Sequence, residues 1–255
     1  QKKCDIFSAQ NQGKAESNSS FKPPANGVPV IENDPRQAVH NSSKAPYSAI
    51  AWICSYFGQE GPYWGTGAVI PGNKVLTAAH NIFGPPESHT PSLASRIEIT
   101  IGKNGNSEIK RYDFIKNIGN EVYVNPQYLK GKRNNAAYDN LRPHDWSMII
   151  LGDPKDVSPG GALGIECLNK DKARDDVSIT VSGYGADVNQ NALNSPSPYE
   201  ISGKISKDEG DEVFWYDNMT TSPGQSGAPV WYDKEDKDGN PGHYLIGIHT
   251  GTWDK

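Results

Sequence analysis

A serine in a glycine-rich turn is the residue of this sequence best suited to nucleophilic chemistry. Ser226 lies between Gly224 and Gly227, and the turn leads into the apolar segment 228–230. Glycine lets a substrate carbonyl approach the backbone closely, so the N–H groups of Gly224 and Ser226 could donate to an oxygen that becomes negative during acyl transfer. Glycine and serine are also common in ordinary turns, so this pattern does not by itself define a nucleophile.

A histidine and an aspartate lie beside strand-like segments that could bring them to such a serine. The segment 74–79 is typical of a buried strand and ends at His80. Asp145 lies at the start of the apolar segment 146–151, where a carboxylate needs a partner. A hydroxyl becomes nucleophilic near neutral pH only if a base removes its proton, and a third group must fix the tautomer of that base. We therefore predict a triad of His80, Asp145 and Ser226, although a lone histidine is more often structural.

The order of these residues, and the segments around them, resemble a known protease family. Leu76–His80 and Gly224–Pro229 are similar to the histidine and serine segments of chymotrypsin-like proteases. Further segments resemble the bacterial glutamyl endopeptidases over a range from about residue 28 to the last residue: 30–34, 45–51, 179–184, 220–221 and 246–249. The resemblance implies an all-β fold of two antiparallel six-stranded barrels. It also implies a secreted serine endopeptidase that cleaves after glutamate through an acyl-enzyme.

The same resemblance implies which residues would recognise the glutamate. Thr221 and His249 would donate hydrogen bonds to its carboxylate, and a protonated imidazole would strengthen its own bond. The backbone at Thr250 and Gly251 would pair with the extended peptide as an added strand. Without the resemblance, His249 could instead end an alternating strand and face solvent.

Composition agrees with many short strands in a chain long enough for two domains. Hydrophobic residues make up 35% of the 255 residues, and 26 Gly and 19 Pro are scattered among short alternating segments, which favours strands over disorder. An Asn104–Gly105 turn is typical of a hairpin. Strands are predicted at 96–101, 121–124, 177–181 and 244–248.

We expect three parts along the chain. Residues 29–165 would form a barrel that carries His80 and Asp145, and residues 166–255 a barrel that carries Ser226 and the specificity pocket. Residues 1–28 are polar and read as an N-terminal extension, either a prosegment or a disordered tail.

In the family, the mature α-amino group helps to neutralise the substrate glutamate. A free terminus near Val28 to Val30 would be needed for this, so we expect a zymogen activated by a cut there. Relatives in the family also continue beyond the position of Thr252 with a further strand and a helix.

Three cysteines allow at most one disulfide inside the chain. The resemblance to chymotrypsinogen-type precursors implies a Cys4–Cys167 pair that would tether the extension. Cys54 lies in a strand-like segment, where a small buried thiol is the ordinary expectation.

Several function classes are disfavoured by the sequence. A net charge of −5 without a basic cluster argues against nucleic acid as a partner, and no apolar stretch approaches the roughly 20 residues of a membrane span. The acidic segment 233–239 could hold calcium, but a charged hairpin tip is the simpler interpretation. The chemistry needs no metal and no cofactor. The resemblance implies an extracellular protein that acts on peptides, and we expect it to be a monomer. The alternative is a proteolytically silent or zymogen-like toxin or binding protein that retains the fold.

Overall fold

The structure is a computed structural model that describes most of the chain as β-strands. The described residues are 7–12, 33–84, 92–115, 120–137, 140–152, 160–168, 177–189, 195–208, 213–235 and 238–253. They form two large sheets and a small third sheet of β6 (Phe83–Gly84) and β7 (Ser92–Leu93). Short 3-10 turns in the described part of the chain include η1 (Tyr47–Ala49), η2 (Ala79–Asn81) and η5 (Arg142–His144).

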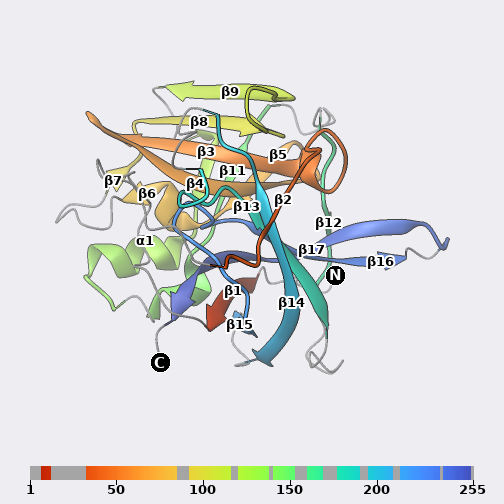
Figure 1. The fold of residues 1–255 in the computed structure, drawn as a ribbon. Coiled ribbons are helices and arrows are strands. Elements are labelled where there is room, and N and C mark those ends of the chain that lie inside the picture. The colour runs from red at the N-terminus through yellow and green to blue at the C-terminus, as the bar shows by residue number, and fades with distance from the viewer. Residues whose placement is uncertain are drawn as a thin grey trace.

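The first large sheet has seven antiparallel strands in the order β10-β11-β5-β4-β3-β8-β9 (Figure 1). Ile53, Leu76 and Ile99 come from three of these strands and belong to one buried hydrophobic core. The strands are β3 (Ile50–Phe57), β4 (Glu60–Ile70), β5 (Lys74–Thr77), β8 (Arg96–Ile101), β9 (Lys110–Ile115), β10 (Val122–Val124) and β11 (Ser147–Ile150).

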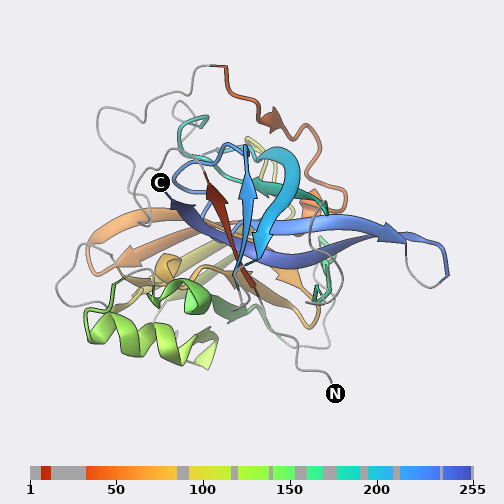
Figure 2. The ribbon, with the colours of Figure 1, turned by 90° about the horizontal axis from the view of Figure 1, so that it is seen from below.

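The second large sheet closes on itself. Its path β1-β15-β14-β13-β16-β17 returns to β1, because β1 pairs with both β15 and β17 (Figure 2). Val181, Tyr216 and Val230 lie in the core of this barrel. Its strands are β1 (Phe7–Gln12), β13 (Ser178–Gly183), β14 (Tyr199–Asp208), β15 (Val213–Asp217), β16 (Pro229–Glu235) and β17 (Pro241–Trp253), with β2 (Gln37–Ala38) and β12 (Gly164–Ile165) attached at the side.

The strand β1 belongs to the segment that the sequence marks as an extension. It pairs in parallel with β15, where Ser8 lies opposite Val213, and with β17, where Ala9 lies opposite His249. Backbone groups supply these pairings, so a polar sequence can take part in them. The N-terminal segment therefore contributes a wall to the second barrel.

The prediction of an all-β, chymotrypsin-like architecture is confirmed, with differences in detail. All four predicted strands occur, as β8, β10, β13 and part of β17, and Gly105 lies in the predicted turn with φ +57°. The first sheet holds seven strands, and its outer strands β10 and β9 do not pair with each other within the described residues. The predicted division at residue 165 leaves β12 in the first part, although β12 pairs with β17.

The described residues contain a single α-helix, α1 (Pro126–Arg133). Asn125 caps it through a hydrogen bond from Gln127 N to its Oδ1 of 2.8 Å, and Pro126 occupies the first turn, where its missing N–H costs nothing. No helix in the described ranges has the length and apolar character required to cross a bilayer.

Candidate active site

Two neighbouring strands of the first sheet bring His80 and Asp145 to the same end of that sheet. β5 and β11 are antiparallel, and Thr77 at the end of β5 lies opposite Ser147 at the start of β11. His80 follows Thr77 in η2, and Asp145 precedes Ser147. The register of this pair therefore places both side chains together, as the sequence predicts for an imidazole and its orienting carboxylate.

The carboxylate of Asp145 holds His80 at two points. Its Oδ2 lies 2.7 Å from His80 Nδ1, and its Oδ1 accepts from the backbone N of His80 at 3.0 Å. Both side chains are buried, at 1% and 0% exposure. A proton shared with Asp145 at Nδ1 leaves Nε2 as the nitrogen that can take up another, and no described residue hydrogen-bonds to Nε2. The pair has the geometry of a general base with a fixed tautomer.

Ser226 lies in the turn between β15 and β16, directly beside this pair. Its backbone carbonyl accepts from Asn81 Nδ2 and from the backbone N of Thr66, each at 2.8 Å. Asn81 is the neighbour of His80, so the serine turn of one sheet is fixed against the histidine turn of the other. The described contacts include no hydrogen bond between the Ser226 hydroxyl and His80, and such bonds often shorten only when substrate binds.

Two peptide groups of the serine turn are oriented by hydrogen bonds to their carbonyls. Pro223 O accepts from Ala186 N at 2.8 Å, and Gln225 O accepts from Ala228 N at 2.9 Å. In a trans peptide the N–H points opposite to the C=O, so the N–H groups of Gly224 and Ser226 point away from those partners. Neither N–H donates to a backbone carbonyl in the described part of the chain. Both can therefore serve a negative oxygen.

Gly224 can occupy this turn because it lacks a Cβ. Its φ is +93°, and a Cβ there would lie 2.5 Å from Tyr184 O. A side chain at this position would strain the backbone and push the turn away from Tyr184.

The residues expected to bind glutamate, Thr221 and His249, flank the serine turn in different ways. Thr221 Oγ1 is buried and has no hydrogen-bond partner among the described residues, so it can still donate to a ligand. His249 lies on β17, and its backbone N and O bond to Ala228 O at 2.8 Å and Gly227 N at 2.6 Å. The imidazole is 3% exposed, so the alternative that it faces solvent is wrong.

The electrostatics of His249 differ from the sequence expectation of a protonated ring. Burial, together with the nearby His80, lowers the pKa of His249 to about 3, so the ring is neutral near pH 7 in the free protein. Its Nδ1 lies 2.5 Å from the hydroxyl of Tyr216, a fully buried residue on β15. Burial raises the pKa of Tyr216 well above its usual value, so the phenol keeps its proton. Tyr216 was not singled out by the sequence, because nothing local shows that β15 and β17 both pair with β1.

Thr250 and Gly251 follow His249 on β17 and are buried. The backbone of this stretch pairs with β1, where Gln10 lies opposite Gly251. The pairing of this backbone with a substrate peptide stays a prediction.

The cysteines follow the expected pattern in one respect. Cys54 is a buried free thiol whose pKa is raised by burial. Cys4 lies outside the described residues, so its pairing with Cys167 stays a prediction. Within the described ranges no group of three or more His, Cys, Asp or Glu residues could hold a metal ion. Residues 236 and 237 of the acidic segment lie outside those ranges.

The chain resembles known proteases in sequence and in fold. No family model matches it. It is 26% identical over 241 residues to a glutamyl endopeptidase of Bacillus licheniformis, a match that covers 94% of this chain and 66% of that protein. A solved Glu endopeptidase in complex with MPD has a TM-score of 0.59 and 21% identity, over 86% of this chain and 94% of the other. Protease Anisep from Arthrobacter nicotinovorans has a TM-score of 0.52 and 16% identity, over 86% and 93%.

These structural matches show that the chain has a chymotrypsin-like fold. The sequence match adds a resemblance to one glutamyl endopeptidase, of which this chain spans 66% of the length.

Proposed function

We propose that this chain is a serine endopeptidase whose catalytic residues are His80, Asp145 and Ser226. The observation that carries the proposal is the buried His80–Asp145 pair held beside the Ser226 turn, with Nε2 unpartnered among the described residues. Ser226 Oγ attacks the peptide carbonyl carbon while its proton passes to His80 Nε2. Asp145 stabilises the imidazolium, and the Gly224 and Ser226 N–H groups stabilise the oxyanion.

The same groups complete the reaction. His80 returns the proton to the leaving amine as the peptide C–N bond breaks, which leaves an acyl-enzyme at Ser226. Water then attacks the ester carbonyl, with His80 as the base again, and the free acid leaves.

Glutamate before the scissile bond is the substrate residue that Thr221 and His249 suit best. We assign the Tyr216 hydroxyl as the donor to His249 Nδ1, because in the opposite arrangement the proton of this buried phenol would lose Nδ1 as its acceptor. His249 then carries its proton on Nε2, and this N–H donates a hydrogen bond to the substrate carboxylate. The Thr221 hydroxyl donates a second hydrogen bond to the same carboxylate. The carboxylate also raises the pKa of His249 as it binds, which adds charge to the bond. The name of the Bacillus licheniformis relative supports this substrate class.

A matched peptide series tests the proposal. Four peptides that differ only in having Glu, Gln, Asp or Leu before the scissile bond are incubated with the purified chain. We expect cleavage after Glu with a kcat/KM at least about 100-fold above that for Gln. Equal cleavage of Glu and Gln peptides would remove the glutamate assignment and leave the protease assignment. Cleavage of none of them, and no labelling of Ser226, would instead favour a proteolytically silent or zymogen-like protein that retains the fold.

The alternative of a precursor form leads to a second proposal. We propose that the protein is secreted as a monomer, that a cut near residues 28–30 raises its activity, and that a Cys4–Cys167 bond then retains the severed segment. Pairing of β1 within the second barrel also favours retention of residues 7–12. Mass spectrometry after activation should give one species under non-reducing conditions and two after reduction. If the uncut protein cleaves Glu peptides as fast as the cut one, the precursor proposal fails.

A further inference from the structure

We infer that Arg36 is a positioning residue that shapes the turn 222–226, with Asp187 as its fixed counter-ion. The inference rests on the proposed function, because the turn matters for catalysis only if Ser226 is the nucleophile. Arg36 touches neither the substrate carbonyl nor the triad in this account. It acts through the residues on either side of Gly224.

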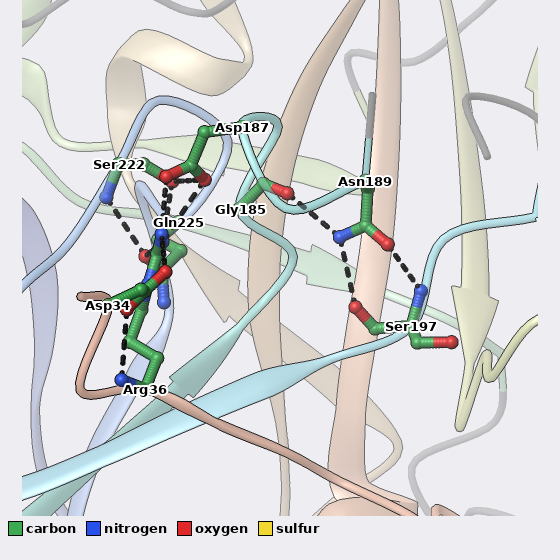
Figure 3. A network of polar contacts seen from close by, with 8 residues as sticks. All are labelled: Asp34, Arg36, Gly185, Asp187, Asn189, Ser197, Ser222 and Gln225. Atoms are coloured by element: carbon green, nitrogen blue, oxygen red, sulfur yellow. Dashed lines mark hydrogen bonds and ion pairs between the residues drawn. The ribbon is translucent and has the colours of Figure 1, made fainter. Parts of the chain in front are cut away.

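The guanidinium of Arg36 is completely buried and fully engaged. Its side chain has 0% exposure, and it forms ion pairs with Asp34 and Asp187 (Figure 3). Burial opposes the charged form, but hydrogen bonds and charge from the two carboxylates outweigh it and raise the pKa of Arg36. Burying a charge that lacks partners is strongly unfavourable, so these carboxylates fix the guanidinium in place.

The same guanidinium also reaches the serine turn. Its Nη1 donates to Ser222 Oγ at 2.9 Å and to Gln225 Oε1 at 3.1 Å (Figure 3). Gln225 Oε1 accepts from Ser222 N as well, at 2.9 Å, and Ser222 Oγ donates to Asp187 Oδ1 at 2.5 Å. Ser222 and Gln225 stand on either side of Pro223 and Gly224. Arg36 therefore contacts the residues on both sides of the Pro223–Gly224 pair, and Asp187 contacts one of them, Ser222.

Asp187 lies on a turn that is itself held rigidly. Asn189 Nδ2 donates to Gly185 O at 2.8 Å and to Ser197 O at 3.0 Å, and Asn189 Oδ1 accepts from Ser197 N at 2.8 Å (Figure 3). Next to Asp187, Ala186 N donates to Pro223 O, which orients the Gly224 N–H. A network that starts at Arg36 thus ends at one of the two groups proposed to stabilise the oxyanion.

Arg36 joins a distant part of the chain to this turn. It directly precedes β2, whose Gln37 lies opposite Glu200 of β14. Its position is therefore set by the second barrel and not by the serine turn, so it can impose a shape on that turn. Loss of the ion pairs and hydrogen bonds of Arg36 should disorder the peptide group of Gly224 while the two hydrophobic cores stay folded. Loss of a core side chain would instead destabilise the whole fold.

The test compares Arg36→Met with a matched control, Arg96→Met. Arg96 lies on β8 and pairs with Asp113 on β9 at 2.7 Å, in the first sheet and outside the catalytic groups. Active sites of the full chain are first counted by stoichiometric labelling with an organofluorophosphate, and kcat is then expressed per labelled site. We expect Arg36→Met to lower kcat per site about 100-fold, the effect of losing one oxyanion donor, with KM changed by less than about threefold. Arg96→Met should stay within about twofold of the parent.

A purely structural role for Arg36 predicts a different result, because a less stable protein has fewer active sites but the same kcat at each. A kcat per site within about threefold of the parent would overturn the inference and leave the protease assignment intact. An inactive and unlabelled parent protein would overturn the proposed function, and this inference with it.

Two milder changes keep the inference testable if Arg36→Met does not fold. Ser222→Ala removes the hydroxyl that bonds to Arg36 and Asp187. Asp187→Asn removes the charge of the counter-ion while keeping its shape. Each substitution should lower kcat per site by about tenfold or more. Each should also weaken the binding of a glutamyl aldehyde, which forms a tetrahedral adduct, more than it weakens the binding of the cleaved acid product. Unchanged kcat per site in both variants would contradict the inference.

Discussion

His249 shows how the position of a single side chain changes its chemistry. In the sequence it is one of six histidines, and its type alone suggests a ring that is partly charged near neutral pH. In the fold it is buried, neutral and paired with Tyr216. A neutral ring held in one tautomer still donates a hydrogen bond to a carboxylate, and it avoids a buried positive charge when no substrate is present.

Substituting His249 tests its proposed role in specificity. We expect His249→Gln to lower kcat/KM for Glu peptides about 100-fold and for Gln peptides less than about fivefold, because only the carboxylate loses a charge-assisted bond. Tyr216→Phe should have a smaller effect in the same direction, since the ring stays but its tautomer is no longer fixed. The measurement is kcat/KM on the two peptides for each variant. Equal losses on both substrates would place His249 outside the glutamate site.

The serine turn of the second sheet packs tightly against strands of the first sheet. A Cβ on Gly227 would lie 2.1 Å from Thr66 O on β4 and 2.3 Å from Thr77 Oγ1 at the end of β5. The φ of Gly227 is +84°. The turn that displays Ser226 thus fits against the strands that position His80 only if this residue has no side chain.

We therefore expect Gly227→Ala to destabilise the fold by about 3 kcal/mol or more, from backbone strain and steric overlap together. Gly58→Ala is the matched control, because Gly58 has φ +65° but nothing within 4 Å of its Cβ position. Gly58→Ala should lower the free energy of unfolding by only about 1 kcal/mol, because it adds backbone strain without steric overlap. Urea unfolding of the two variants and the parent gives both values. Similar costs for both substitutions would show that the turn can move away from β4.

Elements with a strong local signal could be predicted from the sequence, and those fixed by distant partners could not. The apolar segment 74–77 and the residues 147–150 predict β5 and β11, and these two strands position His80 and Asp145, two of the three proposed triad residues. The polar segment of β1 has no alternating pattern, so its place in the barrel depends only on backbone pairing. Arg36 could not be assigned a role, because all its partners except Asp34 lie far away in the sequence.

The buried His249 makes the free energy of unfolding of the whole protein depend on pH. Its pKa is about 3 in the folded protein and about 6.5 in an unfolded chain, so between these values the unfolded state binds more protons. Stability therefore falls as the pH is lowered from above 6.5 toward 3. At pH 5 this one group should lower the free energy of unfolding by about 2 kcal/mol relative to pH 8.

The contribution of His249 can be isolated from that of other groups. Urea unfolding at pH 8 and pH 5 is measured for the parent, for His249→Gln and for His40→Gln, which changes an exposed histidine. The difference between the two pH values should shrink by about 2 kcal/mol in His249→Gln and stay unchanged in His40→Gln. A difference that is the same in all three proteins would show that His249 is protonated in the folded state.

In the proposed mechanism, the hydroxyl of Ser226 in the turn between β15 and β16 is a nucleophile activated by His80. The most direct measurement is the reaction of the chain with an organofluorophosphate, followed by peptide mapping of the modified residue. We expect one adduct at Ser226, no adduct in Ser226→Ala, and labelling slowed at least about 1,000-fold in His80→Ala, because these residues act as a unit. Labelling at another residue, or equal labelling rates in the parent and His80→Ala, would contradict it.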